Sequence, residues 1–510
     1  MFRKFIRTVT VTGLSALFFL NSGISASALD RTPVGSVITC GGSIVAKYPG
    51  MIEQLSDAML EHRTNIDVSG YNIPFSEKLF TELVEEIRAA CPEAFYIKGL
   101  SCSINGSDNL LKIVPTYTAS AQESKKMLAE FGKAADYYLD IVKKTLPDGD
   151  DFSKALLLHD LIASNSSYVS IEKNDINYGA YEILVKGTGN CYCYSRAYAY
   201  LLAQLGIPSE IVYSDSMNHE WVKVRLGDKY YHVDLTWDDS NAVDELGYTF
   251  FLLSDDRIKL TFPAGAHTDF ETVTPSDDKY DMKLFHSFTT PVCFANNKIY
   301  TVYDSALVRY EPESNSIEKL VDLSGEKWYF GDGSRYWLGC YSGACSSGGM
   351  VFYNTADEIF MYDPKNGSTS QVCRRETGNA FYGMRTVGDT VYAVCRANPD
   401  SMPTAVKLGS VCKVTYLSGT GGGTSRQVLF ENGKAEKPED PVRKGYEFTG
   451  WKLNGRDYDF SAPVKGNITL TAGWKSVSPE LTAEQIAAGT TAALNISRAL
   501  RTDLVCPRII

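Results

Sequence analysis

The pattern of hydrophobic and polar positions changes in character along the chain. From about residue 29 to 275, stretches with apolar residues at helical spacing are interleaved with short runs typical of strands. From about residue 276, strand-like runs separated by turn residues dominate, until a helical pattern returns near the end. A mixed region followed by a strand-rich one predicts an α+β fold with β-rich modules after it.

The beginning of the mixed region predicts an α/β extension over residues 29–150. A long helical pattern rich in Ala, Lys and Glu closes it. We expect the extension to support the region that follows, and shaping a neighbouring cleft is the alternative role. The predicted helices cover residues 49–63, 77–91 and 120–146, and the predicted strands cover 95–98 and 110–117.

The segment from residue 189 to 239 gives the sharpest pattern. Asn190 is a favourable N-cap, so Cys191 is expected to be the first residue of a helix. Apolar residues recur at helical spacing until Gly206 ends the run. Strands are then expected over residues 207–213, 220–226 and 229–235, and the last two form a hairpin.

The alternation along this hairpin brings polar side chains together. His219 shares the face of Trp221, while Val222, Val224 and Leu226 form the opposite, apolar face. On the return strand, Tyr230, His232 and Asp234 share one face. His219 and Asp234 are therefore expected side by side, facing the helix that begins at Cys191.

Three side chains of this segment form a candidate catalytic set. Cys191, His219 and Asp234 occur in the order that supplies a nucleophile, a base and a group that orients the base. A thiol at a helix N-terminus lies at the positive end of the helix dipole, which favours the thiolate. Taken singly, each residue has an ordinary structural interpretation. Their joint occurrence favours a thiol triad, whereas His232 is interpreted as structural.

The same residues resemble the transglutaminase-like superfamily, whose core is papain-like. The likeness rests on three blocks, Gly189–Ser195, His219–Trp221 and Tyr230–Trp237. Two positions depart from the usual pattern, because Cys193 replaces a glycine and Ser195 an alanine. The second thiol leaves a disulfide or a redox effect open. The resemblance assigns the nucleophile, the base and the orienting group to Cys191, His219 and Asp234.

The strand-rich region 276–412 contains two similar segments. Residues 307–312 and 359–364 lie 52 residues apart, each after a strand with tyrosine, and residues 390–395 predict a further strand. Such spacing suggests propeller-like blades, although the region is too short for a closed propeller. Its aromatic residues are expected to pack in sheets, and stacking on carbohydrate or peptide is the alternative.

Residues 413–475 form a separate module. The stretch from Gly445 to Trp451 and the pair Gly473–Trp474 resemble the Listeria–Bacteroides repeat, a small β-grasp-like module. That resemblance implies an extracellular spacer or a binding role, with no chemistry of its own. The final residues, 476–510, predict a helical tail that begins with a capping box at Thr482 and Gln485.

The first residues predict a signal peptide. Arg3, Lys4 and Arg7 precede the apolar run 9–20, and Ala26–Ala28 form a small-residue cleavage site. Residues 1–28 are therefore expected to be removed. The mature protein is expected to be secreted or associated with the cell surface, without a membrane-spanning segment.

Composition narrows the remaining possibilities. The 510 residues are too many for one core, and the net charge of −11 without a basic cluster argues against a nucleic-acid partner. The twelve cysteines lack metal-ligand spacing, so neither a metal nor another cofactor is expected. Cys340 with Cys345, or Cys373 with Cys395, are candidate disulfides.

The resemblance implies acyl transfer on amide bonds of proteins or peptides through a thioester. Water as the acceptor makes a cysteine peptidase or amidase, which we favour for residues 151–275. A lysine amine as the acceptor makes a protein-crosslinking transglutaminase. The third possibility is a non-catalytic surface-binding protein with a vestigial triad, whose β modules hold a cell-surface or wall component. The backbone N–H of Cys191 is a natural oxyanion donor, and a second donor is not assigned.

Overall fold

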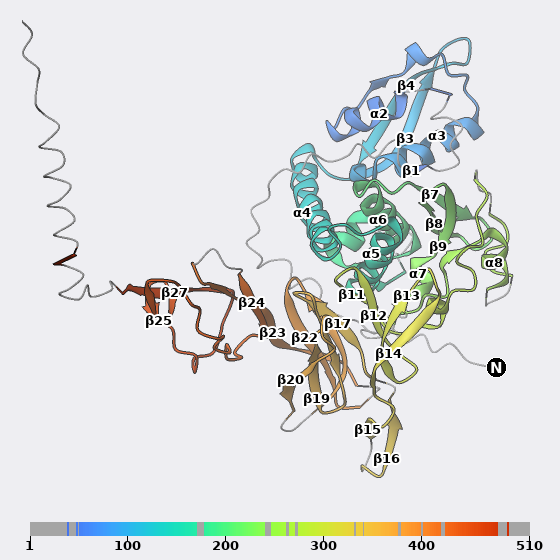
Figure 1. The fold of residues 1–510 in the computed structure, drawn as a ribbon. Coiled ribbons are helices and arrows are strands. Elements are labelled where there is room, and N and C mark those ends of the chain that lie inside the picture. The colour runs from blue at the N-terminus through green and yellow to red at the C-terminus, as the bar shows by residue number, and fades with distance from the viewer. Residues whose placement is uncertain are drawn as a thin grey trace, which may run out of the picture. The chain divides into compact units, whose positions relative to one another are not determined.

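A computed structural model describes most of the chain outside its two ends (Figure 1). The expected signal peptide and nearly all of the helical tail lie outside the described residues. The chain divides into two compact units, residues 1–408 and 409–510, and the finer division stays a prediction. No helix of the described part is long and apolar enough to cross a membrane. The described residues are 38–39, 47–48, 50–170, 178–239, 246–261, 265–270, 274–330, 333–339, 341–375, 379–398, 401–419, 424–477 and 487–488.

All five elements predicted between residues 29 and 150 are present. A small antiparallel sheet of order β2-β4-β3 packs with two amphipathic helices, and a long helix follows whose N-cap Ser120 forms a capping box with Glu123. The strand predicted over 95–98 starts later and is longer, because β3 pairs with β4 over eight residues. The elements are α2 (Met51–Leu60), β2 (Ile66–Asp67), α3 (Glu77–Ala90), β3 (Ile97–Ile104), β4 (Leu110–Tyr117) and α4 (Ala121–Thr145).

Two helices and a five-stranded sheet form the core of the first unit. Helix α6 is buried along nearly its whole length and packs against α5 and strand β8, as Figure 1 shows for the central part of the fold. Every strand predicted from residues 207 to 235 is present. The helices are α5 (Asp151–Asn165) and α6 (Cys191–Gln204), and the sheet runs β1 (Ile38–Thr39), β7 (Ser209–Ser214), β8 (His219–Leu226), β9 (Lys229–Val233), β10 (Phe251–Leu253).

The end of the hairpin differs from the prediction. Strand β9 stops at Val233 instead of residue 235, because the Asp234 carboxylate accepts the backbone N–H of Trp237 and caps the short helix α7 (Leu235–Asp238). The face of β8 that carries Trp221 and Lys223 is covered by further residues of the chain. Lys223 is completely buried, with Nζ 3.2 Å from the carboxylate of Asp255 at the start of α8 (Asp255–Leu260).

The strand-rich part of the first unit contains two four-stranded antiparallel sheets, each with its strands in chain order. The two similar segments seen in the sequence are the third strands, β13 and β19, of these sheets, which supports the propeller-like description. The third predicted strand is β22, paired with β21. The first sheet is β11 (Cys293–Ala295), β12 (Lys298–Tyr303), β13 (Ala306–Glu311), β14 (Ser316–Asp322). The second is β17 (Ala344–Ser347), β18 (Met350–Asn354), β19 (Glu358–Tyr362), β20 (Thr369–Arg374). The others are β15 (Lys327–Phe330), β16 (Arg335–Leu338), β21 (Ala380–Val387), β22 (Thr390–Arg396).

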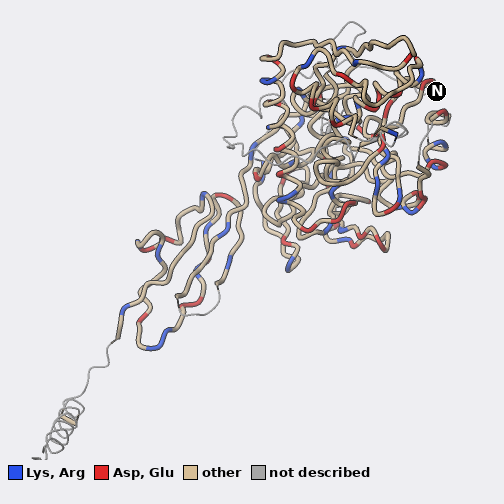
Figure 2. Tube along the Cα trace, turned by 90° about the horizontal axis from the view of Figure 1, so that it is seen from above, with Lys and Arg blue, Asp and Glu red and all other residues tan. Residues whose placement is uncertain are grey.

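The second unit is built on a mixed sheet. Its first and last strands, β23 and β27, pair in parallel, and β24 and β25 flank them in antiparallel fashion. Trp451 is buried at its core and packs against Tyr416. The strands are β23 (Thr404–Leu417), β24 (Ser425–Phe430), β25 (Tyr446–Leu453), β26 (Arg456–Asp457) and β27 (Ile468–Ser476). Acidic and basic residues are interspersed along the trace of the described chain (Figure 2).

Candidate active site

Cys191 lies at the first position of helix α6, as predicted from the sequence. The side chain of Asn190 caps the helix by accepting the backbone N–H of Cys193 at 3.3 Å. Gly189 is required before the cap, because a Cβ there would lie 2.5 Å from the Cβ of Cys193. Cys191 is half-buried, so its thiol sits at the positive end of a helix and remains accessible.

The hairpin and helix α7 bring the two other predicted residues to the thiol. The Nε2 atom of His219, at the start of β8, lies 2.6 Å from Oδ2 of Asp234, at the cap of α7. His219 also lies close enough to Cys191 for the sulfur to contribute to raising the pKa of the imidazole. Because Nε2 is occupied by the carboxylate, Nδ1 is the ring nitrogen left to face the thiol. The structure thus brings the three residues together in the order thiol, imidazole, carboxylate.

The charges in this set stabilise one another. Burial lowers the pKa of His219, but the charge and hydrogen bond of Asp234 and the contact with Cys191 raise it to about 10. Burial raises the pKa of Asp234, but His219 and His267 lower it to about 2. An imidazolium held next to a thiol favours the thiolate, which is the nucleophilic form.

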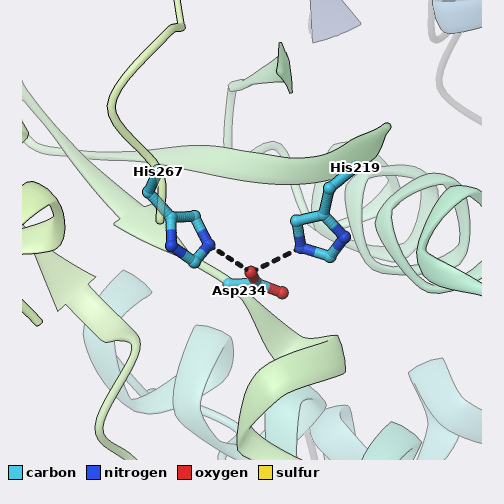
Figure 3. Close-up of side chains that lie close together, drawn as sticks. All are labelled: His219, Asp234 and His267. Carbon is cyan, nitrogen blue, oxygen red and sulfur yellow. Dashed lines mark hydrogen bonds and ion pairs between the residues drawn. The ribbon is translucent and has the colours of Figure 1, made fainter. Parts of the chain in front are cut away.

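His267 is a member of this cluster that the sequence analysis missed. Its Nε2 atom lies 2.8 Å from Oδ2 of Asp234, so one carboxylate oxygen accepts two imidazoles. Figure 3 shows the two rings on opposite sides of the carboxylate. His267 follows Asp234 by 33 residues, in a stretch without helical or strand periodicity. No local signal of the sequence indicates that this histidine returns to the site.

Among the described residues, His219, Asp234 and His267 form the one group of three side chains with the donors to hold a metal ion. Their spacing is that of hydrogen bonds, at 2.6 and 2.8 Å between nitrogen and oxygen. Ligands about 2.0–2.1 Å from a tetrahedral metal lie farther apart than this. The cluster therefore fits a hydrogen-bonded chain better than a metal centre.

The neighbouring thiol of Cys193 is set apart from the site. Cys193 is buried, its S–H donates to Oδ1 of Asn190 at 3.2 Å, and burial raises its pKa to about 12. Cys191 and Cys193 are both free thiols, so the disulfide left open by the sequence is not formed. The suggested pair Cys373 and Cys395 is likewise unbonded. In the other suggested pair, Cys345 is a free thiol and Cys340 lies outside the described residues.

His232 has the structural role expected from the sequence. Its Nδ1 accepts the indole N–H of Trp221 at 2.8 Å, and its Nε2 donates to the carboxylate of Asp255 at 2.7 Å. Burial lowers the pKa of His232 to about 4, although Asp255 opposes the shift. Trp221 in turn stacks on His219, with ring centroids 5.7 Å apart. His232 therefore orients the tryptophan behind the triad and does not contact the thiol set.

A buried ion pair locks the cysteine helix to the histidine strand. Arg196 of α6 makes two hydrogen bonds of 3.0 Å to the carboxylate of Glu220, the residue after His219. Ser195, the departure from the family's alanine, donates its hydroxyl to the same carboxylate. All three are buried. The distance between Cys191 and His219 thus depends on this bidentate contact.

Replacing Arg196 with methionine is expected to lower the free energy of unfolding by about 3–5 kcal/mol, because Glu220 would be left charged and buried without its partner. Urea unfolding followed by circular dichroism measures the change. The matched control is Lys298→Met, which breaks the 2.9 Å contact between two exposed side chains, Lys298 and Glu311, and should cost about 1 kcal/mol or less. Equal losses in the two variants would contradict the role of the lock.

Two exposed tyrosines lie near Cys191. Tyr168 in β5 (Ser167–Tyr168) pairs with Gly189 of β6 (Thr188–Gly189), just before Cys191. Tyr213 in β7 lies one position from Ser214, which pairs with His219. Both side chains are substantially exposed and lie within electrostatic range of Cys191.

Two known families match parts of the chain. Residues 140–235 match the transglutaminase-like superfamily, and residues 413–473 match the Listeria-Bacteroides repeat domain. Both resemblances noted in the sequence are thereby confirmed, as is the α+β class with a β-rich C-terminal region. Comparison with curated proteins gives no match.

Several solved structures share weak similarity with the chain. A candidate cysteine protease of Cytophaga hutchinsonii is 14% identical over 27% of this chain and 61% of its own length, with a TM-score of 0.18. A candidate protease of Parabacteroides distasonis is 14% identical over 27% and 36%, with a TM-score of 0.17. The extracellular domain of a one-component system of B. thetaiotaomicron is 11% identical over 50% and 32%, with a TM-score of 0.17. The chain thus covers less than two thirds of each of these proteins.

Proposed function

We propose that residues 151–275 form a thiol enzyme that cleaves amide bonds in proteins or peptides. The observation that carries the proposal is the alignment of an accessible thiol at a helix N-terminus with His219 and the buried Asp234. The match of residues 140–235 to the transglutaminase-like superfamily supports the same chemistry. A thioester is the intermediate of this reaction.

The reaction follows from the roles of the three side chains. The Cys191 sulfur attacks the amide carbonyl carbon, and its proton resides on Nδ1 of His219. When the tetrahedral intermediate collapses, His219 gives this proton to the leaving amine and the C–N bond breaks. Water, deprotonated by His219, then attacks the thioester and releases the acid and the free thiol. The backbone N–H of Cys191 has no acceptor within its own helix, so it is available to the oxyanion.

The thiolate–imidazolium pair is tested by alkylating the full-length protein with iodoacetamide from pH 4 to 10. Mass spectrometry is expected to find rapid labelling of Cys191 below pH 7, and His219→Ala should abolish this labelling. Cys193 should stay unlabelled in the native protein, because its buried thiol has a pKa of about 12. Labelling of Cys191 only near the pKa of an ordinary thiol, about 8.5, would contradict the proposal and favour a surface-binding protein with a vestigial triad.

The acceptor of the acyl group separates hydrolysis from crosslinking. We favour water, and incubation with a casein substrate should then release new amino termini. A transglutaminase would instead attach a fluorescent primary amine to glutamine side chains, in a reaction that Cys191→Ala abolishes. We place the enzyme outside the cell, since residues 413–473 match a repeat whose resemblance implies an extracellular spacer or binding module. The predicted signal peptide agrees with this placement, and a cell-surface or wall component is the proposed partner of the second unit.

A further inference from the structure

His267 occupies a special place beside the proposed triad. It is completely buried, and its Nε2 atom lies 2.8 Å from the same oxygen of Asp234 that accepts His219 (Figure 3). Its other ring nitrogen, Nδ1, has no hydrogen-bond partner among the described residues. The hydrogen bond to Asp234 is therefore the one polar interaction of this buried ring among the described residues.

The ring is held rigidly in this orientation. It packs edge-on against Trp221, at 4.9 Å between ring centroids, and against Trp237, at 4.7 Å. The backbone of His267 has a φ of 48°, in the left-handed region that residues with side chains rarely adopt. Its N–H donates to the sulfur of Met217 at 3.0 Å. Such a conformation persists only where the surrounding contacts enforce it.

The segment around His267 is also tied to the turn that precedes His219. The Asp269 carboxylate accepts the hydroxyl of Ser214 and the backbone N–H of Ser216, the latter at 2.8 Å. Phe270 forms a bridge with Ser214, which pairs with His219 across β7 and β8. Residues 267–270 thus contact both the turn that precedes His219 and the carboxylate of Asp234, which binds His219.

We propose that His267 is a positioning residue, which holds Asp234 ionised and oriented so that it aligns His219 with Cys191. This role rests on the proposed thiol chemistry. Asp234 is completely buried and accepts three hydrogen bonds, from the backbone of Trp237 and from the two imidazoles. Without the donor on His267, a buried carboxylate would lose one of the groups that favour its charged form.

The electrostatic surroundings of Asp234 define the expected direction. Burial raises the pKa of Asp234, whereas His219 and His267 lower it. The carboxyl group of Asp238, on the same short helix, is another acidic group that interacts with Asp234. Loss of the His267 donor therefore makes Asp234 easier to protonate. The imidazolium of His219 then loses its partner at a higher pH than in the native protein.

Two variants separate hydrogen bonding from packing. His267→Phe keeps a ring among the aromatic side chains but has no donor, and His267→Gln keeps an N–H donor but has no ring. The rate of Cys191 alkylation is measured on the full-length protein from pH 3 to 9. In the Phe variant the acid limb should move up by about one pH unit, so the rate at a given pH on that limb should fall about tenfold. The Gln variant should stay close to the native profile.

The opposite pattern, with a native profile for Phe and a displaced one for Gln, would show that His267 only fills space and would overturn the proposal. Equal profiles in all three proteins would overturn it as well. If the Phe variant does not fold, as judged from its urea midpoint, His267→Met replaces it as the variant without a donor. The alkylation profile of the native protein tests the proposed triad itself. A native Cys191 that reacts only as an ordinary thiol contradicts the triad itself, and the positioning role falls with it.

Discussion

Cys191→Ala is expected to lower the rate of amide hydrolysis by about 10⁴-fold or more, which leaves only the background from substrate binding and the oxyanion donor. The alanine removes the nucleophile from the first turn of α6 and leaves the cap by Asn190 intact. Release of amino termini from a casein substrate measures the loss. Unfolding in urea should be nearly unchanged, since Cys191 is half-buried at the site.

The matched control is Cys193→Ala, two residues along the same helix. The Cys193 thiol is buried, and burial keeps it protonated with a pKa of about 12, so it supplies no thiolate at neutral pH. Its loss should change the hydrolysis rate by less than about tenfold, because the cap by Asn190 is mainly to the backbone. If Cys193→Ala abolishes turnover while Cys191→Ala does not, the nucleophile has been assigned to the wrong residue.

Asp234→Asn is expected to have the second-largest effect, a fall of about 10³–10⁴-fold in the hydrolysis rate. The Asn amide nitrogen cannot accept the N–H that Nε2 of His219 donates to Oδ2 in the native protein. An Asn nitrogen facing this ring instead favours a proton on Nδ1, where the imidazole can no longer take one from Cys191. The carboxylate is therefore required to select the tautomer that acts as a base.

The pH profile supplies a second measurement on the same variant. Burial lowers the pKa of His219, and Asp234 is the group that contributes most to raising it to about 10. In Asp234→Asn this support is lost, so the imidazolium should give up its proton at a lower pH than in the native protein. Below that pH the imidazolium remains, and above it the thiol has no cationic neighbour. Rapid alkylation of Cys191 should thus be confined to a narrower and more acidic range.

Asp255→Asn is the matched control for this substitution. Asp255 also contacts a histidine of the same sheet, His232, at 2.7 Å, but that pair does not touch Cys191. Its loss should destabilise the fold around Lys223, and the rate for each folded molecule should change by less than about tenfold. If both variants lose turnover equally, the effect of Asp234 comes from packing rather than from its contact with His219.

The local structure of the site follows from short-range rules. An N-cap at Asn190 followed by apolar residues at helical spacing places Cys191 at a helix start, and α6 begins at that residue. The alternation of residues 219–226 and the turn at Gly227 predict the hairpin, and β8 and β9 pair as expected. The same rules predict the three helices and the strand β4 of the extension to within a few residues, whereas β3 is longer than predicted and β2 was not predicted.

The local rules fail where a side chain competes with the backbone pattern. The pattern predicts Asp234 inside the returning strand, but its carboxylate caps α7, and β9 ends at Val233, two residues before the predicted end. The alternation of β8 divides its residues into two faces but does not predict that α8 and residues near Thr274 cover Lys223 on the second one. Alternation describes the two faces of a strand, and it contains no information about what packs on the second face.

The sequence alone therefore determined the helix start, the hairpin and the order of Cys191, His219 and Asp234, because each depends on residues within about one turn or one strand pair. Only the tertiary structure decided that Ser195 and Arg196 lock onto Glu220 and that His267 returns to Asp234. These contacts join segments 24 to 33 residues apart. Their formation depends on how the chain folds back through the core, and no local periodicity encodes that path.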